Sequence, residues 1–257
     1  MNSAIVGYSG FVGSNLVSSH EFTDKYKSSN IADIQGKHYD LVVFAAAKAE
    51  KWRINQDPAS DLQHISQLED VLRSFSTDQL VLISTVDVYA NPIDVDERTV
   101  VKVDGLHAYG RHRYRLEQFA LQQHPSVLVM RLPGLFGRGI KKNVIFDLLN
   151  ENNLSAIHRA GRFQYYALQH LWSDIQTALA HRLNLLNVAT EPIRTDEVAK
   201  ACFGTDFSNE PPESTPGSYD MRSVHANLFG GNDGYLYSKK QVLAELRDFV
   251  IEERAAR

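Results

Sequence analysis

Three residues with reactive side chains lie around the middle of the chain. Thr85 closes an apolar run of strand length (80–83, then Ser84), and Tyr109 follows 24 residues later. A hydroxyl at the carboxyl end of a parallel strand can hydrogen-bond a substrate carbonyl, because an open α/β sheet presents its ligands at that edge. Arg113 lies four residues after Tyr109, so the two share one face of an expected helix. These side chains are the first candidates for chemistry on a bound ligand.

A glycine motif stands at the N-terminus, between a short apolar run (3–6) and a segment with helical periodicity (11–19). Glycine tolerates positive φ and lets the backbone approach phosphates, while the N–H groups of the following helix face the anion. An ordinary glycine turn is the alternative, and the position after an N-terminal strand favours a dinucleotide pyrophosphate site. The residues expected to contact the dinucleotide here are Gly7, Ser9, Gly10, Phe11, Val12 and Gly13.

The elements that position these residues follow from the apolar pattern. The strand-length runs are apolar throughout instead of alternating, which predicts strands covered on both faces and hence a parallel sheet between helices. The expected fold is α/β, a Rossmann-like doubly wound parallel sheet with a small C-terminal substrate-binding lobe. Strands are expected at 3–6, 41–45, 80–83 and 127–130, and helices at 11–19, 59–75 and 109–123.

The second half of the chain is less regular. Its expected helices are 144–150, 171–183, 195–201 and 238–257, and the last opens on a capping-box pattern at Ser238. A stretch rich in Pro, Ser and Glu at 207–219 reads as an exposed loop. We expect residues 1–137 to form the dinucleotide-binding region. Residues 138–257 are expected to form mostly the substrate-binding lobe and C-terminal helix, without being an independent domain.

Composition restricts the partners. The chain has 257 residues, a net charge of -4 and no Lys or Arg block longer than two residues, so nucleic acid is not an expected partner. No apolar run approaches the roughly 20 residues that cross a bilayer, which leaves no membrane segment and predicts a cytoplasmic location. Cys202 is the only cysteine and the ten His lack metal spacing, so neither an internal disulfide nor a metal site is expected.

The order and spacing of the motifs together resemble the extended short-chain dehydrogenase/reductase family, the NAD-dependent epimerase/dehydratase group that acts largely on nucleotide sugars. The resemblance covers nearly the full chain. The segments that carry it are Gly7-x-x-Gly10-x-x-Gly13, Ala45-Ala46-Ala47 after a strand, Ser84-Thr85-x-x-Val88-Tyr89, Tyr109-Gly110 and Arg131-Leu132-Pro133-Gly134-Leu135-Phe136-Gly137.

The resemblance implies roles for the reactive residues. Tyr109 would exchange a proton with the substrate hydroxyl or carbonyl, and Thr85 would orient that group. To act as a base near neutral pH, the phenol pKa of about 10 must fall by roughly 3 units, with help from a nearby cation and the nicotinamide charge. The further cofactor contacts that the resemblance implies are Ala45, Ala46, Ala47, Tyr109, Arg113 and Pro133.

Two positions depart from the family pattern. Arg113 stands where the motif has lysine, and its guanidinium keeps the positive charge but is planar and cannot give up a proton. His64 stands where the family has an asparagine that supports the active site. A solvated helix residue is the alternative reading of Arg113, and a plain helix histidine that of His64.

The cofactor is expected to be NAD or NADP. An NAD enzyme of this kind carries an acid at the end of the second strand, whereas this chain has Tyr-Lys-Ser-Ser-Asn at 26–30. Without a carboxylate there, and with Lys25 and Lys27 nearby, a 2′-phosphate is not repelled, which favours NADP. Ser29 is an expected contact, and the pair Asp33 and Ile34 resembles the family's adenine contacts, a plain loop acid being the alternative.

Substrate selection is expected to involve the second half. Arg162 could pair bidentately with a phosphate of a nucleotide sugar, with Tyr165 beside it. A surface charge and an ordinary aromatic cluster are the alternatives. In the first half, Asp87 and Thr85 are the expected substrate contacts, and Asp87 is a candidate base.

Two functions follow. The first is an NAD(P)-dependent oxidoreductase or epimerase that acts on a nucleotide-linked sugar by hydride transfer, with Tyr109 as acid/base, Thr85 as orienting hydroxyl and Arg113 as electrostatic partner. The alternative is a dinucleotide-binding regulatory or scaffold protein of the same fold without turnover, because Arg113 replaces the lysine. The resemblance also suggests a homodimer through the helices at 59–75 and 109–123.

Overall fold

The computed structural model describes residues 1–212 and 215–256, which divide into two compact units. The first unit contains Met1–Ala90, Glu97–Leu132 and Gln169–Asn187, and the second contains Asn91–Asp96, Pro133–Leu168 and Val188–Arg257. The chain therefore passes between the units several times. Residues 169–187, which the sequence assigned to the C-terminal region, return to the first unit.

The first unit is built on a parallel sheet of six strands in the order β2-β1-β3-β4-β6-β10. The predicted doubly wound parallel sheet is confirmed. Its central strands are buried on both faces, as their unbroken apolar runs indicate. The strands are β1 Ser3–Val6, β2 Asp24–Tyr26, β3 His38–Phe44, β4 Ser76–Thr85, β6 Val127–Leu132 and β10 Leu185–Asn187.

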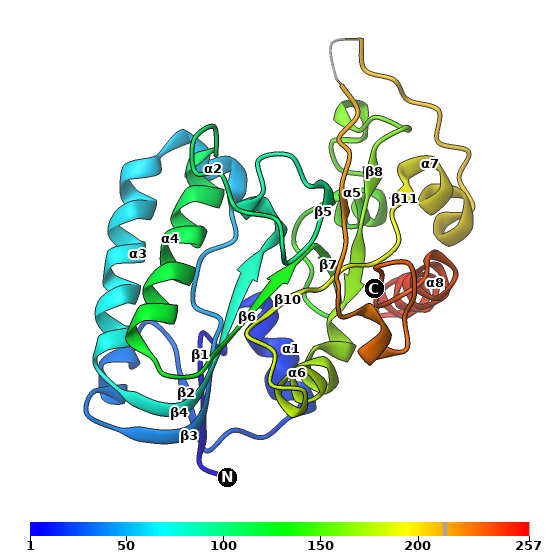
Figure 1. Cartoon of the computed structure of the whole chain (residues 1–257). Helices are drawn as coiled ribbons and strands as arrows, with labels where there is room; N and C mark the ends of the chain where they lie inside the picture. The colour runs from blue at the N-terminus through cyan, green and yellow to red at the C-terminus, as the bar shows by residue number, and fades with distance from the viewer. Residues whose placement is uncertain (213–214, 257) are drawn as a thin grey trace. The chain divides into compact units, whose positions relative to one another are not determined.

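Helices flank this sheet (Figure 1). The pair α3 and α4 pack against each other, as do α1 and α6. The helices are α1 Phe11–Ser19, α2 Lys51–Gln56, α3 Pro58–Arg73, α4 Ala108–Gln123 and α6 Leu171–Ala180. Four of them match expected helices closely, whereas the short polar α2 was not expected.

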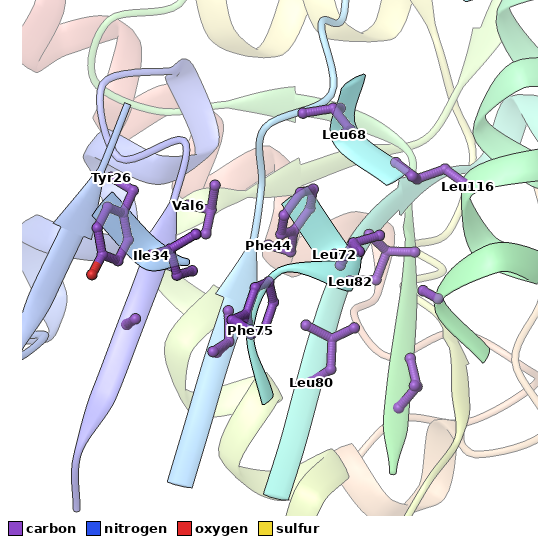
Figure 2. Packing of buried hydrophobic residues seen from close by; sticks show 14 of the residues in the cluster. Val6, Tyr26, Ile34, Phe44, Leu68, Leu72, Phe75, Leu80, Leu82 and Leu116 are labelled. Carbon is purple, nitrogen blue, oxygen red and sulfur yellow. The ribbon is translucent and has the colours of Figure 1, made fainter. Parts of the chain in front are cut away.

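A hydrophobic core fills the space between the sheet and the helices α3 and α4. Helix α3 starts cleanly because Asp57 accepts a hydrogen bond from the Ser60 N–H (3.2 Å) and Pro58 takes the first helical position. Its apolar residues then recur on one face and bury against the strands. Figure 2 shows this cluster, with Val6, Tyr26, Ile34, Phe44, Leu68, Leu72, Phe75, Leu80, Leu82 and Leu116 labelled.

The strand order fixes where a ligand can bind. From β1 the chain moves to β2 on one side, and then returns to β3 on the other side of β1. In an open α/β sheet such a reversal leaves a crevice at the carboxyl ends of the two adjoining strands. Gly7 follows β1 and Ala45 follows β3, so the glycine turn lies at this point.

The second unit contains short strand pairs and three α-helices within the described residues. The strand β7 (Gly134–Phe136) pairs in parallel with β9 (Tyr165–Ala167), and β5 (Ile93–Val95) with β12 (Asp220–Met221). The strand β8 (Arg162–Phe163) pairs antiparallel with β11 (Ile193–Arg194). The helices are α5 Val144–Asn150, α7 Thr195–Val198 and α8 Lys239–Ala255.

Sequence expectations for this unit hold in part. Helix α5 has the expected bounds, and α8 begins after Ser238, whose hydroxyl accepts from the Gln241 N–H (3.3 Å). Helix α7 is shorter than expected because the chain widens into a π-helix at Ala199–Phe203. In the expected loop at 207–219, residues 213 and 214 lie outside the described residues.

Candidate active site

The glycine turn has a geometry that only glycine permits at two positions. Gly7 has φ +95°, and a Cβ there would lie 2.5 Å from the Ala45 carbonyl oxygen. A Cβ on Gly13 would lie 2.1 Å from the Gly7 carbonyl oxygen. The turn, the end of β3 and the first turn of α1 therefore meet backbone to backbone. Gly10 is the N-cap residue of α1 and brings no side chain to the helix start.

This cradle fits a dinucleotide pyrophosphate. The first N–H groups of a helix have no intrahelical partner and attract an anion. Ser9 and Gly10 are exposed, while Phe11 and Val12 are half-buried at the start of α1. Ala45, Ala46 and Ala47 are also half-buried and continue from β3 alongside the turn. The predicted cofactor residues of the glycine turn therefore lie beside those that follow β3, at the carboxyl ends of two neighbouring strands.

The end of β2 presents a cation in place of an acid. Tyr26 is buried, and the Lys27 ammonium lies 5.9 Å from the ring centre of Tyr8, which belongs to the glycine turn. The Asn30 side chain fixes this loop by accepting from the Lys27 N–H (2.8 Å) and donating to the Lys25 carbonyl (3.1 Å). A lysine therefore lies beside the glycine turn. The sequence has no carboxylate at this position that could bind the ribose hydroxyls.

The other residues expected near the adenosine half have different environments. Ser29 is exposed in the loop after β2, and Asp33 is exposed in the short helix Ile31–Ile34. The Ile34 side chain is fully buried and belongs to the hydrophobic core, which leaves its backbone for the predicted contact with adenine. Core packing explains its apolar character.

Thr85 and Tyr109 meet at the end of β4, as predicted. Both are largely buried, and a hydrogen bond joins Thr85 to the phenol. The N–H of Asp87 donates to the Thr85 hydroxyl oxygen (3.2 Å), which caps the short helix Val86–Val88. A Cβ on Gly110 would lie 2.0 Å from the Asp87 carbonyl oxygen, so α4 can approach β4 this closely only with glycine after Tyr109.

Arg113 lies against Tyr109, and both of its Nη atoms donate to other groups. The guanidinium carbon is 4.4 Å from the centre of the Tyr109 ring. Its Nη1 donates to Asp61 Oδ2 (2.5 Å) and its Nη2 donates to the Lys48 carbonyl. The side chain is only 3% exposed, which excludes the alternative of a solvated helix residue.

Burial raises the pKa of Tyr109, and this is the largest influence on it. The Arg113 guanidinium opposes that rise, the Asp87 carboxylate adds to it, and the Thr85 hydrogen bond and the Lys51 ammonium lower it. The expectation that the phenol pKa falls is therefore not met by the protein's own groups. Desolvation of the phenolate outweighs the cation beside it.

Behind Arg113 lies a buried polar cluster that the sequence did not reveal. Asp61 Oδ2 also accepts from His112 Nδ1 (2.7 Å), while Asp61 Oδ1 and Arg113 Nε have no hydrogen-bond partner among the described residues. His64 donates to the Ala46 carbonyl, and burial followed by the nearby Lys48 lowers its pKa. Among the described residues, no group hydrogen-bonds the buried Nε2 of His64. This helix histidine therefore has one ring nitrogen without a hydrogen bond.

A further group of residues approaches Tyr109 from α2. Lys51 Nζ lies 2.7 Å from Asp87 Oδ1, and Asn55 Oδ1 accepts from the Tyr109 N–H (3.1 Å). His107 caps α4 by accepting from the Gly110 N–H (3.1 Å), and burial lowers its pKa. The only sequence signal for this group was the position of Asp87 two residues after Thr85.

Arg162 and Tyr165 are the predicted substrate residues of the second unit. Arg162 is exposed, and its backbone is held by Gly217 and Tyr219. A cavity of about 180 Å³ adjoins it, lined in part by Gly161 and Phe163. Tyr165 is 2% exposed and packs inside the second unit, so its contact with a substrate stays a prediction.

Three further predictions concern Pro133, metal ligands and membrane-spanning helices. Pro133 is half-buried directly after β6. No group of three or more His, Cys, Asp or Glu residues that could hold a metal ion occurs among the described residues. Over the same residues, no helix combines the length and apolar character of a membrane span.

The parallel sheet, its strand order and the glycine turn after β1 define a Rossmann-like α/β fold. No family model matches the sequence, and no curated protein matches it. Solved structures share the fold over nearly the whole chain at low identity.

Three of these similar structures are sugar-nucleotide enzymes or bind a nicotinamide dinucleotide. A dTDP-4-dehydrorhamnose reductase from Bacillus anthracis in complex with NADP has a TM-score of 0.75 at 16% identity, covering 98% of this chain and 99% of that one. RMD from Pseudomonas aeruginosa complexed with NADPH has a TM-score of 0.74 at 18% identity, covering 98% and 100%. A UDP-N-acetylglucosamine 4-epimerase from Methanobrevibacter ruminantium has a TM-score of 0.71 at 13% identity, covering 100% and 99%. The predicted Rossmann-like fold is confirmed.

Proposed function

We propose that the protein is an NAD(P)H-dependent reductase that acts on a keto group of a nucleotide-linked sugar. The observation that carries this proposal is the meeting of the Tyr109 phenol and the Thr85 hydroxyl at the end of β4, with the Arg113 guanidinium 4.4 Å from the phenol ring. The names of similar structures, which include reductases and an epimerase of sugar nucleotides, support the substrate class.

The protonation state of Tyr109 favours the reductive direction over oxidation. Because burial raises its pKa, the phenol keeps its proton at neutral pH and acts as a proton donor. A carbonyl that receives hydride develops negative charge on oxygen, which a hydroxyl donor at Thr85 and a phenol at Tyr109 stabilise. When bound, the reduced nicotinamide supplies the hydride. An epimerase would need Tyr109 to act as a base as well.

The cofactor is proposed to bind at the glycine crevice. At Gly7 and Gly13 the missing Cβ lets the turn, the end of β3 and α1 pack backbone to backbone, and the start of α1 offers N–H groups to an anion. Lys27 beside the turn favours NADPH over NADH, since a 2′-phosphate would gain a cation there. Arg162 of the second unit is proposed to pair with a substrate phosphate.

The oligomeric state and the location of the protein are also proposals. A homodimer through α3 and α4 is compatible with exposed apolar side chains on both helices, Leu62 and Leu121. A cytoplasmic location stays a prediction from the sequence.

The second candidate is a dinucleotide-binding protein without turnover. It is favoured by Arg113, whose Nη donors hold Asp61 and the Lys48 carbonyl in place of a ligand. Both candidates predict that the protein binds a dinucleotide, and they differ only in chemistry.

Titration of the purified protein with NADPH and NADH separates the proposals, followed by turnover on a panel of nucleotide-linked keto sugars. The reductase predicts binding and NADPH oxidation with at least one panel member. Binding without turnover, in the protein and in an Arg113→Lys variant, favours the second candidate. Gly13→Val is the binding control because its side chain would overlap the Gly7 carbonyl, and absence of binding in the unaltered protein contradicts both.

A further inference from the structure

The short helix α2 directs two polar side chains at the Tyr109 site. Lys51 and Asn55 stand four residues apart, so they lie on one helix face. Asn55 Oδ1 accepts from the Tyr109 N–H (3.1 Å), and Lys51 Nζ lies 2.7 Å from Asp87 Oδ1. One face of α2 therefore binds the backbone N–H of Tyr109 through Asn55 and places the Lys51 ammonium against the Asp87 carboxylate.

Asp87 is held next to the phenol by its backbone. Its N–H donates to the Thr85 hydroxyl oxygen, and its carbonyl lies against Gly110, the residue after Tyr109. Its carboxylate is 16% exposed, whereas the Lys51 side chain is 37% exposed. A half-shielded negative charge thus stands beside a phenol that must exchange a proton, with Lys51 as its ion-pair partner.

The charged and titratable groups around the phenol come from every element packed on it. Arg113 lies on the same helix, Asp87 follows β4, Lys51 is on α2, and His107 caps α4. Arg113 is a fixed cation, because a guanidinium does not release its proton in proteins and because Asp61 and the Lys48 carbonyl hold it in place. Lys51 is the one dissociable ammonium that this set contains among the described residues.

We propose that Lys51 is a positioning residue of the Tyr109 site, whose ammonium neutralises the Asp87 carboxylate beside the phenol. This inference rests on the proposed role of Tyr109. The influences on the Tyr109 pKa agree in sign, since Asp87 raises it and Lys51 lowers it. Lys51 therefore acts mainly by cancelling Asp87.

The test measures ionisation of residue 109 directly. Incorporation of 3,5-difluorotyrosine at position 109 acidifies the phenol and gives a fluorine NMR signal that follows its titration. Lys51→Met should raise the pKa of this phenol by about 0.5 unit or more, because it removes the ammonium that pairs with the Asp87 carboxylate. Asp87→Asn should lower it, and Lys51→Met in the Asp87→Asn background should shift it by less than half as much.

Matched variants separate charge from structure. Lys51→Arg keeps the charge and should leave the titration unchanged, while Arg53→Met removes an exposed cation from the same helix and should also leave it unchanged. Thermal melting confirms that each variant is folded, and Lys51→Gln replaces Lys51→Met if that variant is not. A shift in Lys51→Met that equals the one in Arg53→Met, or that persists undiminished with Asp87→Asn, overturns the inference.

The Lys51 proposal and the reductase proposal can fail separately, because titration of residue 109 and turnover of keto sugars are measured independently. The predicted shifts without any turnover of keto sugars would support the role of Lys51 while the reductase proposal fails. Turnover that depends on Tyr109, together with an unchanged titration in Lys51→Met, would support the reductase and reject the role of Lys51.

Discussion

Two arginines are buried in the first unit, and their environments differ. Arg131 on β6 binds Glu117 through two parallel hydrogen bonds, Nε to Oε1 (3.1 Å) and Nη2 to Oε2 (2.7 Å), and its Nη1 donates to the Tyr89 hydroxyl (2.7 Å). Arg113 on α4 binds one oxygen of Asp61 and one carbonyl, and its Nε has no partner. Both guanidinium groups are at most 5% exposed.

The difference separates a fully hydrogen-bonded ion pair from an incompletely hydrogen-bonded one. Glu117 also accepts from the Ser84 hydroxyl (2.5 Å), so the Arg131 network fixes the end of β4 just before Thr85. A buried ion pair is favourable only when its remaining hydrogen-bonding groups are satisfied. The Arg113 cluster breaks this rule and lies against Tyr109. Incomplete satisfaction next to a reactive group is what a site for a ligand or proton transfer looks like.

The largest stability effect is expected at the satisfied pair. Arg131→Met leaves the Glu117 carboxylate buried with only the Ser84 hydroxyl as a partner. We expect a loss of about 3–5 kcal/mol in the free energy of unfolding, measured by urea denaturation. A loss below about 1 kcal/mol would mean that the pair behaves like a surface salt bridge and would remove the contrast.

The ion pair of Arg113 and Asp61 should contribute less to the free energy of unfolding than the ion pair of Arg131 and Glu117. In Arg113→Met, Asp61 keeps His112 as a partner, so the expected loss is about 1–2 kcal/mol in the same assay. The same variant removes the cation against the phenol ring and should raise the pKa of Tyr109. A loss equal to that of Arg131→Met would contradict the distinction between the two arginines.

The smallest effect is a pH dependence from His64. Burial lowers its pKa in the folded protein, so the unfolded chain takes up the proton first as the pH falls below about 6.5. Its contribution is therefore fully present above that pH and is lost towards the lower folded value. His64→Asn should reduce the stability loss between pH 7 and 5 by less than about 1 kcal/mol. His181→Asn, at an exposed position, is the control and should leave the profile unchanged.

The sequence predicts most of the first unit because its strands are unbroken apolar runs. The glycine turn and the shared face of Tyr109 and Arg113 are also local patterns, and the structure has both. Two elements were missed for physical reasons. The strand β10 has only three residues, and α2 is short and polar, so neither shows a periodic signal.

The partners of the site residues could not be predicted. Asp61 lies 52 positions from Arg113, and Lys51 lies 36 positions from Asp87, so only the tertiary fold brings them together. The expected fall in the Tyr109 pKa was inferred from a nearby cation and the nicotinamide charge. Burial acts in the opposite direction and is the larger influence, and side-chain burial depends on packing that a motif does not describe.

The central claim is that Tyr109 donates the proton when a keto sugar is reduced. It is tested most directly by following NADPH oxidation at saturating nucleotide-linked keto sugar, in the unaltered protein and in Tyr109→Phe, with NADPH affinity measured in parallel. The account predicts that Tyr109→Phe lowers turnover by about 10²- to 10⁴-fold while NADPH affinity changes little. Undiminished turnover in Tyr109→Phe would contradict it.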